Sequence, residues 1–291
     1  MIIEGDTVGE IYLMLIDELL TAPCASPRGQ QTRELLGVQL RLHDALANVL
    51  VNSVRNPNYR FMVTEWLWTL TGSDHVEPLA RVNKKMLDYS DDGKHLSGSY
   101  GPRWHAQIGS ALRRLYEDPN TRRAVISFWR HDYDSKVDSK DVPCTLTMQL
   151  ILRDQKLSAV VNMRSSDAWL GIPYDVFNFT MLLNYAASQL EVGVGKLVLN
   201  LGSSHLYQVN FSEALQMLSP DQPVSTLRSA PLTSLTGFQF IGIADAVERG
   251  RLFDLLHEPW SAYLDAALCV TRARAFEILK EVHEQQQNVN R

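Results

Sequence analysis

Four short blocks of this sequence carry residue types that could act on an anionic, planar substrate. Cys144 follows Pro143 at the head of a predicted strand, and its thiolate would be a nucleophile. The other blocks offer guanidinium groups for a phosphate, carboxyl groups at a strand-to-helix junction, and an imidazole beside a phenol: Arg122 with Arg123, Arg164 with Ser165, Asp167 and Asp175 around LGIPY, and His205 with Tyr207 after Gly202, Ser203 and Ser204.

Each block on its own also has an ordinary structural explanation. A lone cysteine is usually packed and inert, and paired arginines usually lie on a solvated face. Asp175 stands two residues after a helix-starting proline, where the helix dipole favours an acid. The residue types alone therefore lead only to a globular domain with an anion site.

The elements that must position these residues are mixed helices and strands. The spacing of apolar residues predicts helices over 8–20, 59–70, 105–117, 173–190, 206–218 and 271–287, and strands over 36–42, 124–129, 145–152, 157–163 and 196–201. The polar turn 153–156 joins two of the strands as a hairpin, and 24–32 is a predicted loop. Since there is no regular βαβ alternation, we expect an α+β fold with a large mixed sheet. No repeat or linker divides the chain, so residues 1–291 are predicted to form a single domain.

Composition narrows the class of protein. Of the 291 residues, 45% are apolar and 21% charged, as in an ordinary globular protein. A net charge of −5 gives no overall attraction to a nucleic acid polymer. The three cysteines are too scattered for a disulfide framework, and no metal site is predicted. Without an apolar run of about 20 residues or a basic leader, we expect no membrane contact and a cytoplasmic location.

The order and spacing of the blocks resemble the thymidylate synthase superfamily over roughly residues 10–215. The matching blocks are PC ending at 144, RSSD at 164–167, LGIPYD at 170–175 and GSSHLY at 202–207. Further blocks are similar to the family's N-terminal phosphate loop, its glutamate helix, a tyrosine segment, and the segment that lends two arginines to the partner subunit: SPRGQQT at 26–32, TEWLW at 64–68, SGSYGPRW at 97–104 and DPNTRRAVISFW at 118–129.

This resemblance implies a thymidylate synthase-like fold that dimerises through its sheet and uses 5,10-methylenetetrahydrofolate as co-substrate. It implies catalytic roles for Cys144, Glu65 and Asp175, with Asp175 also reading the base. By the same resemblance, the phosphate lies against Arg28, Arg164 and Ser165 of one subunit and Arg122 and Arg123 of the other, the sugar against His205 and Tyr207, and the folate and its water network against Asp167 and Tyr100.

Several departures from the synthase pattern resemble the phage-type deoxycytidylate hydroxymethylases. Asp175 stands where synthases carry the asparagine that reads uracil. Met163, Thr145 and Ser203 stand where synthases carry Gln, His and Asp, and Met86 stands where they carry a tryptophan that shields a late intermediate from water. Met86 is equally consistent with plain core filling. We therefore expect a deoxycytidylate 5-hydroxymethyltransferase, in the host cytoplasm if a phage encodes it.

Three alternatives stay open at this point. The substrate could be CMP in a nucleoside pathway, although Ser165 and the paired arginines look more like the deoxyribonucleotide enzymes. The chain could also be a thymidylate synthase or dUMP hydroxymethylase with an unusual pocket, or an inactive nucleotide-binding relative. The roughly 80 residues after 215 diverge from the pattern, and the resemblance places nothing there.

Overall fold

The protein is built around one large mixed sheet. The computed structural model describes residues 1–232 and 237–249. Its principal sheet has eight strands in the order β1-β3-β9-β7-β6-β5, with β2 added to β3 and β8 added to β9; a second sheet pairs β4 with β10. The strands are β1 (Ile2–Gly5), β2 (Cys24–Ala25), β3 (Thr32–Leu42), β4 (Val49–Val51), β5 (Val125–Ser127), β6 (Thr145–Arg153), β7 (Lys156–Met163), β8 (Ser166–Asp167), β9 (Gly193–Tyr207) and β10 (Ser225–Leu227).

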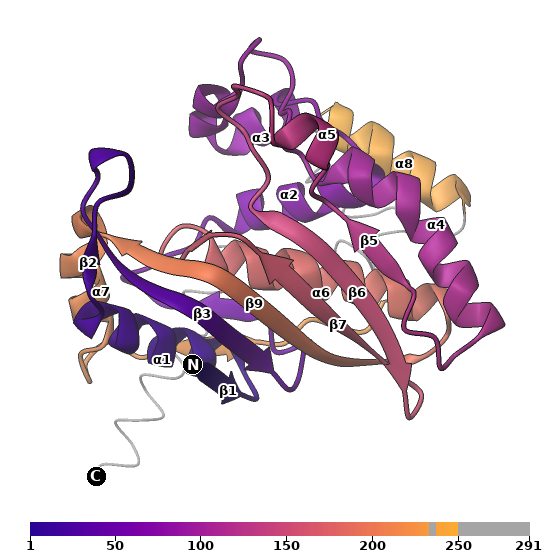
Figure 1. Cartoon of the computed structure of the whole chain (residues 1–291). Coiled ribbons are helices and arrows are strands. Elements are labelled where there is room, and N and C mark those ends of the chain that lie inside the picture. The colour runs from indigo at the N-terminus through magenta and orange to yellow at the C-terminus, as the bar shows by residue number, and fades with distance from the viewer. Residues whose placement is uncertain (233–236, 250–291) are drawn as a thin grey trace.

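Helices cover one face of this sheet, with more helices grouped above it in the view of Figure 1. They are α1 (Val8–Thr21), α2 (Tyr59–Thr71), α3 (Glu77–Val82), α4 (Gly101–Glu117), α5 (His131–Asp134), α6 (Ile172–Gln189), α7 (Phe211–Met217) and α8 (Gly237–Glu248), with 3-10 turns η1 (Pro27–Gly29), η2 (Lys84–Tyr89) and η3 (Gln208–Asn210). Helix α6 packs on β7 and β9, α1 packs on β3, and α2 packs on α6. The expected α+β fold with a large, helix-covered mixed sheet is thus confirmed.

Local signals explain where the main helices begin and end. Thr7 and Glu10 form a capping box at the start of α1. Asn58 caps the first turn of α2, and Gly72 ends that helix with φ 84°, a conformation that glycine adopts without strain. Pro173 occupies the first turn of α6, where its missing N–H costs nothing. The predicted helices 8–20, 59–70 and 173–190 are therefore confirmed to within a residue or two.

Other predicted elements need correction. The helix predicted over 206–218 begins only at Phe211, because β9 continues through Tyr207, which pairs with Thr32 of β3. The strand predicted over 36–42 is the C-terminal part of the longer β3, and the strand predicted over 196–201 is the middle of the longer β9, for the same reason. The loop predicted over 24–32 contains β2 and η1. Helix α4 starts at Gly101, four residues earlier than predicted. The helix predicted over 271–287 lies outside the described residues.

The sheet face away from α1 and α6 carries a row of polar side chains. Amide and hydroxyl groups bond across four adjacent strands in register: Gln39 to Asn200 at 2.7 Å, Asn200 to Asn162 at 2.9 Å, and Asn162 to Thr147 at 2.9 Å. Within the described residues, no helix combines the length and the apolar character needed to cross a membrane.

Candidate active site

Cys144 stands immediately before β6, opposite the end of β7. Its side chain is half-buried, and its backbone carbonyl accepts a hydrogen bond from the Arg164 N–H at 2.8 Å. The Arg164 guanidinium donates to the carbonyls of Pro143 at 2.9 Å and Val142 at 3.0 Å. Arg164 therefore holds the segment that leads into Cys144 and also brings a positive charge beside it.

Tyr100 connects the cysteine strand to the helical layer. Its hydroxyl accepts from the backbone N–H of Thr145 at 3.2 Å and from the Thr145 hydroxyl at 2.9 Å, which leaves its own proton to donate. Burial raises the pKa of Tyr100, and the negative charges of Cys144 and Asp175 raise it further. The charges of Cys144 and Asp175 therefore both act on the Tyr100 phenol.

Two carboxyl groups from facing helices meet in this region. Glu65 comes from α2 and Asp175 from the first turn of α6. Burial raises the pKa of Asp175 to about 7, with a further contribution from the charge of Asp167, although the Ser166 hydroxyl at 3.4 Å opposes the shift. Burial raises the pKa of Glu65 to about 8, and the charge of Asp175 adds to this. Near neutral pH both groups can hold a proton, as acid–base chemistry requires.

The turn that presents Asp175 depends on Gly171. A Cβ at residue 171 would lie 2.8 Å from the carbonyl of Asp167 and 3.1 Å from Oδ2 of Asp175. The backbone N–H of Asp175 donates to the Gly171 carbonyl at 2.9 Å, so the helix starts directly from this close approach. A larger residue at position 171 would therefore push against both aspartates.

Asp167 and His205 lie side by side on paired strands β8 and β9. Asp167 Oδ1 accepts from the backbone N–H groups of Trp169 at 2.8 Å and Leu170 at 3.0 Å. Burial raises the pKa of Asp167 despite these bonds and the nearby His205. Burial lowers the pKa of His205, although Asp167 and Glu34 oppose this. A neutral His205 presents one donor and one acceptor, and its ring packs edge-to-face on Tyr207 at 5.1 Å.

The residues predicted to bind phosphate divide into two groups. Arg164 and Ser165 follow β7 beside Cys144, and Arg28 lies on η1, where its side chain is not described. Arg122 and Arg123 are exposed and precede β5, whose Val125 pairs with Gln149 of β6. Gln149 is five residues along β6 from Cys144, roughly 17 Å at the usual rise of a strand. The structure therefore does not bring Arg122 and Arg123 to the Cys144 of their own chain.

Sequence reasoning missed Arg55 and Glu34. Arg55 is buried, donates to the Trp169 carbonyl at 2.6 Å, and lies over the rings of Trp169 and Tyr174. Glu34 accepts a hydrogen bond from the Ser203 hydroxyl and pairs with His205 in the β3–β9 register. Neither residue stands in a recognisable block. Arg55 precedes Asn-Pro and Glu34 lies in an alternating strand, so both look like surface residues in the sequence.

Comparison with known families accounts for this arrangement. Residues 10–243 match the family model described as thymidylate synthase, which extends beyond the limit near residue 215 that the motifs had suggested. Enzymes of this family transfer a one-carbon unit from methylenetetrahydrofolate to a nucleotide and typically form dimers. Because the match covers most of the 291 residues, the chain belongs to the thymidylate synthase family.

Proposed function

We propose that this enzyme is a deoxycytidylate 5-hydroxymethyltransferase. It would convert dCMP, methylenetetrahydrofolate and water into 5-hydroxymethyl-dCMP and tetrahydrofolate. The observation that carries the proposal is Asp175, a carboxyl group whose pKa is raised to about 7. It stands at the position where the family's synthases carry asparagine.

Asp175 suits cytosine better than uracil. Cytosine presents N3 as an acceptor and the 4-amino group as a donor, and a protonated carboxyl group offers the matching donor and acceptor. The ionised carboxylate would serve equally well if N3 carried the proton. Uracil reverses both groups, and each buried polar group left unpaired costs about 1–3 kcal/mol. The raised pKa makes the protonated form available at neutral pH.

The proposed reaction begins with Cys144. Its thiolate bonds to C6 of the pyrimidine, and the displaced electron pair makes C5 a carbon nucleophile. C5 would attack the one-carbon unit of methylenetetrahydrofolate, and loss of the C5 proton and of tetrahydrofolate would leave an exocyclic methylene group. Water then adds to the resulting exocyclic carbon, and elimination of Cys144 restores the aromatic ring. Tyr100, whose hydroxyl accepts two hydrogen bonds from Thr145 and keeps a proton to donate, would support the water network.

Glu65 is the proposed group for positioning and deprotonating the water. Since burial raises its pKa to about 8, Glu65 holds a proton in the resting enzyme at pH 7 and must release it before acting as a base. Asp167 suits the folate. Oδ1 of Asp167 accepts both backbone N–H groups, so Oδ2 can accept from the N–H groups of a pterin ring.

The remaining residues divide between phosphate, sugar and water access. Arg28, Arg164 and Ser165 would hold the phosphate in one subunit, and Arg122 and Arg123 would reach it from the partner. His205 and Tyr207 would contact the 3′-hydroxyl. Met86, which packs against the core, replaces the synthase tryptophan by the proposed alignment and would leave water access to C5. Met163, Thr145 and Ser203 support the same assignment.

One experiment tests the proposal directly. The protein is incubated with methylenetetrahydrofolate and dCMP, CMP or dUMP, and the products are weighed by mass spectrometry. We expect 5-hydroxymethyl-dCMP without formation of dihydrofolate. A rise in absorbance from dihydrofolate formed with dUMP would instead identify a synthase. Hydroxymethylation of CMP would identify the ribonucleotide as the substrate. Tight nucleotide binding without turnover would indicate an inactive relative.

Cys144→Ser tests the covalent step. Since serine is a far weaker nucleophile at neutral pH, turnover of dCMP should fall below detection while dCMP binding persists. Normal turnover by this variant would rule out the cysteine mechanism.

Asp175→Asn tests base recognition. The amide presents its donor and acceptor to uracil as the synthases do, so the ratio of kcat/KM for dCMP over dUMP should fall by about 100-fold or more, which corresponds to two mispaired groups. An unchanged ratio would show that Asp175 does not read the base.

A further inference from the structure

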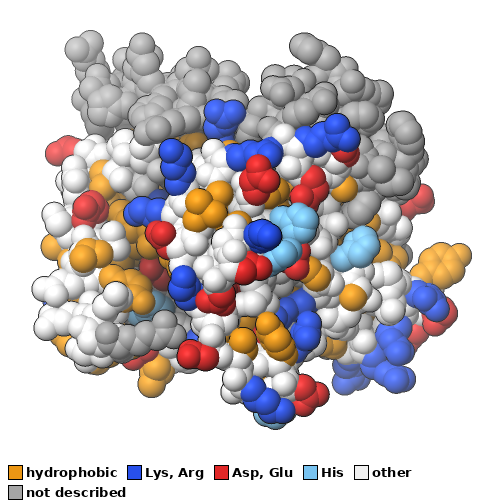
Figure 2. Space-filling model, turned by 90° about the horizontal axis from the view of Figure 1, so that it is seen from above, with side chains coloured by type: hydrophobic (Ala, Val, Ile, Leu, Met, Phe, Trp, Pro, Cys, Tyr) orange, Lys and Arg blue, Asp and Glu red, His pale blue; other side chains and the backbone are white. Residues whose placement is uncertain are grey.

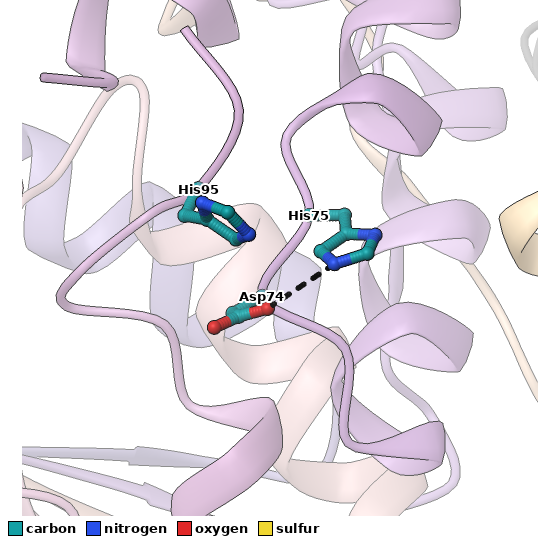
Figure 3. A group of neighbouring side chains, drawn as sticks. All are labelled: Asp74, His75 and His95. Carbon is teal, nitrogen blue, oxygen red and sulfur yellow. Dashed lines mark ion pairs between the residues drawn. The ribbon is translucent and has the colours of Figure 1, made fainter. Parts of the chain in front are cut away.

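A second cluster of titratable side chains is made of residues that the proposed active site does not use. Asp74 and His75 follow the end of α2, and His95 lies on the loop before α4. One ligand atom from each of the three residues lies within 4.8 Å of the others. Figure 3 shows the three side chains turned toward one another. The molecular face in Figure 2 carries histidine side chains flanked by acidic and basic ones.

The backbone holds these side chains in a fixed relation. His75 and His95 form an isolated bridge, flanked by hydrogen bonds from Leu96 N–H to the Asp74 carbonyl at 2.9 Å and from Val76 N–H to the Lys94 carbonyl at 2.8 Å. The buried indole of Trp68 donates to the His75 carbonyl at 2.8 Å. The ligands are therefore preorganised by two chain segments locked together.

Each imidazole also has a carboxylate on its Nδ1. His95 Nδ1 lies 2.8 Å from Asp92 Oδ2, and His75 Nδ1 lies 3.2 Å from Glu248 Oε2. This leaves Nε2 of each ring for another partner, and Nε2 of His75 is 3.9 Å from Asp74. Histidines that bind metals commonly donate their other ring N–H to a carboxylate, which fixes the tautomer and raises the basicity of the ligand nitrogen.

We propose that Asp74, His75 and His95 bind a divalent first-row transition-metal ion, with zinc as the natural test ion. Two imidazoles and one carboxylate form a ligand set that zinc accepts, and a fourth position remains for water. Ligand atoms around such an ion stand roughly 3–3.5 Å apart at bond lengths of about 2.1 Å. The three side chains, about half exposed, can move inward by the ångström that this needs.

The site has a defined mechanical consequence. The loop that carries His95 continues to Gly98, whose N–H donates to Asp141 Oδ2 at 2.8 Å, and to Ser97, whose hydroxyl donates to the Asp141 carbonyl at 2.9 Å. A bound ion would fasten this loop to the end of α2. Zinc should therefore raise the melting temperature of the whole chain.

The test uses untagged full-length protein freed of metal by a chelator and titrated with Zn²⁺ by calorimetry. We expect one ion per chain and no measurable site in His95→Ala. Glu248→Gln removes only the carboxylate that faces His75 Nδ1 and none of the three ligands, so it should bind zinc about 10- to 100-fold more weakly. His43→Ala is the matched control, because His43 is equally exposed and faces a single carboxylate, Glu4.

Two results would overturn the proposal. The first is equal zinc affinity in the parent and His95→Ala proteins, or no binding by either. The second is a thiolate-to-metal absorption band on Co²⁺ substitution, which would place the ion on a cysteine. Nucleotide turnover is not the readout, so failure of this proposal leaves the proposed reaction untouched, and the reverse also holds.

Discussion

Asp175 and Glu65 are two buried carboxylic acids, and the negative charge of Asp175 makes Glu65 harder to ionise. With pKa values raised to about 7 and about 8, they differ from surface carboxyl groups, which ionise near 4. Burial is the largest cause of both pKa shifts, because it destabilises the ionised carboxylate relative to the neutral acid. A site that must hold, release and take back a proton at neutral pH needs such groups.

The proposed cytosine contact makes nucleotide binding depend on pH. Asp175 and N3 of the base must share one proton, whichever atom carries it. Because the pKa of Asp175 is about 7, dCMP affinity should level off toward pH 6 and fall roughly tenfold per pH unit well above 7. Calorimetry of dCMP binding from pH 6 to 9 measures this. Asp175→Asn is the control that keeps the phosphate site, and it should lose this dependence. The same slope in both proteins would assign the proton elsewhere.

At the scale of elements, sequence patterns located the strands and helices whose ends carry chemistry, and failed where tertiary pairing decides the outcome. The blocks around Cys144 and Asp175 lie at the predicted start of β6 and in the first turn of α6. The pattern after residue 205 predicted a helix, because Leu206 fits a helical spacing equally well; pairing with β3 extends the strand instead. Arg55 comes beside the site only through a fold that packs it against Trp169, which no local signal reveals.

A buried ion pair supports the helical layer beside the site. Arg103 of α4 bonds Asp134 of α5 through two contacts, at 2.6 and 2.8 Å, and both side chains are almost fully buried. Arg103 also donates to the Ser97 carbonyl at 2.9 Å. Although burial raises the pKa of Asp134, the bonds from Arg103 and Arg130 outweigh it and hold the pKa below its usual range.

Removing the cation from this pair should be costly. Arg103→Met leaves the Asp134 carboxylate buried without its partner, so the free energy of unfolding should drop by about 3–5 kcal/mol. Urea denaturation at pH 7 measures the loss. Arg113→Met, on the exposed side of the same helix, should change stability by less than about 0.5 kcal/mol. If both variants lowered the free energy of unfolding by a similarly small amount, the Arg103–Asp134 ion pair would add no stability over a methionine at residue 103.

At the scale of the whole molecule, the open sheet face and the distant arginines point to the same assembly. The face opposite α1 and α6 presents the polar row from Gln39 to Thr147, with half-buried Val160 and Val198 in register beside it. No helix among residues 1–232 and 237–249 covers this surface in Figure 1. Pairing through it, the predicted dimer, would carry the Arg122–Arg123 segment of one subunit toward the other subunit's site.

Subunit complementation decides whether the arginines cross. One chain carries Cys144→Ser and the other carries Arg122→Ala with Arg123→Ala; each homodimer should be inactive. The two are co-expressed with different affinity tags, and the heterodimer is isolated. If the arginines act in the partner, one of its two sites is complete and turnover returns to about half of the parent value. If they act within their own chain, both sites stay defective.

A heterodimer of the parent chain with one carrying all three substitutions must give the opposite pattern: no activity if the arginines cross, and about half if they do not. Gln149, which pairs with Val125 just after the two arginines, lies roughly 17 Å along the chain from Cys144, and this separation favours crossing.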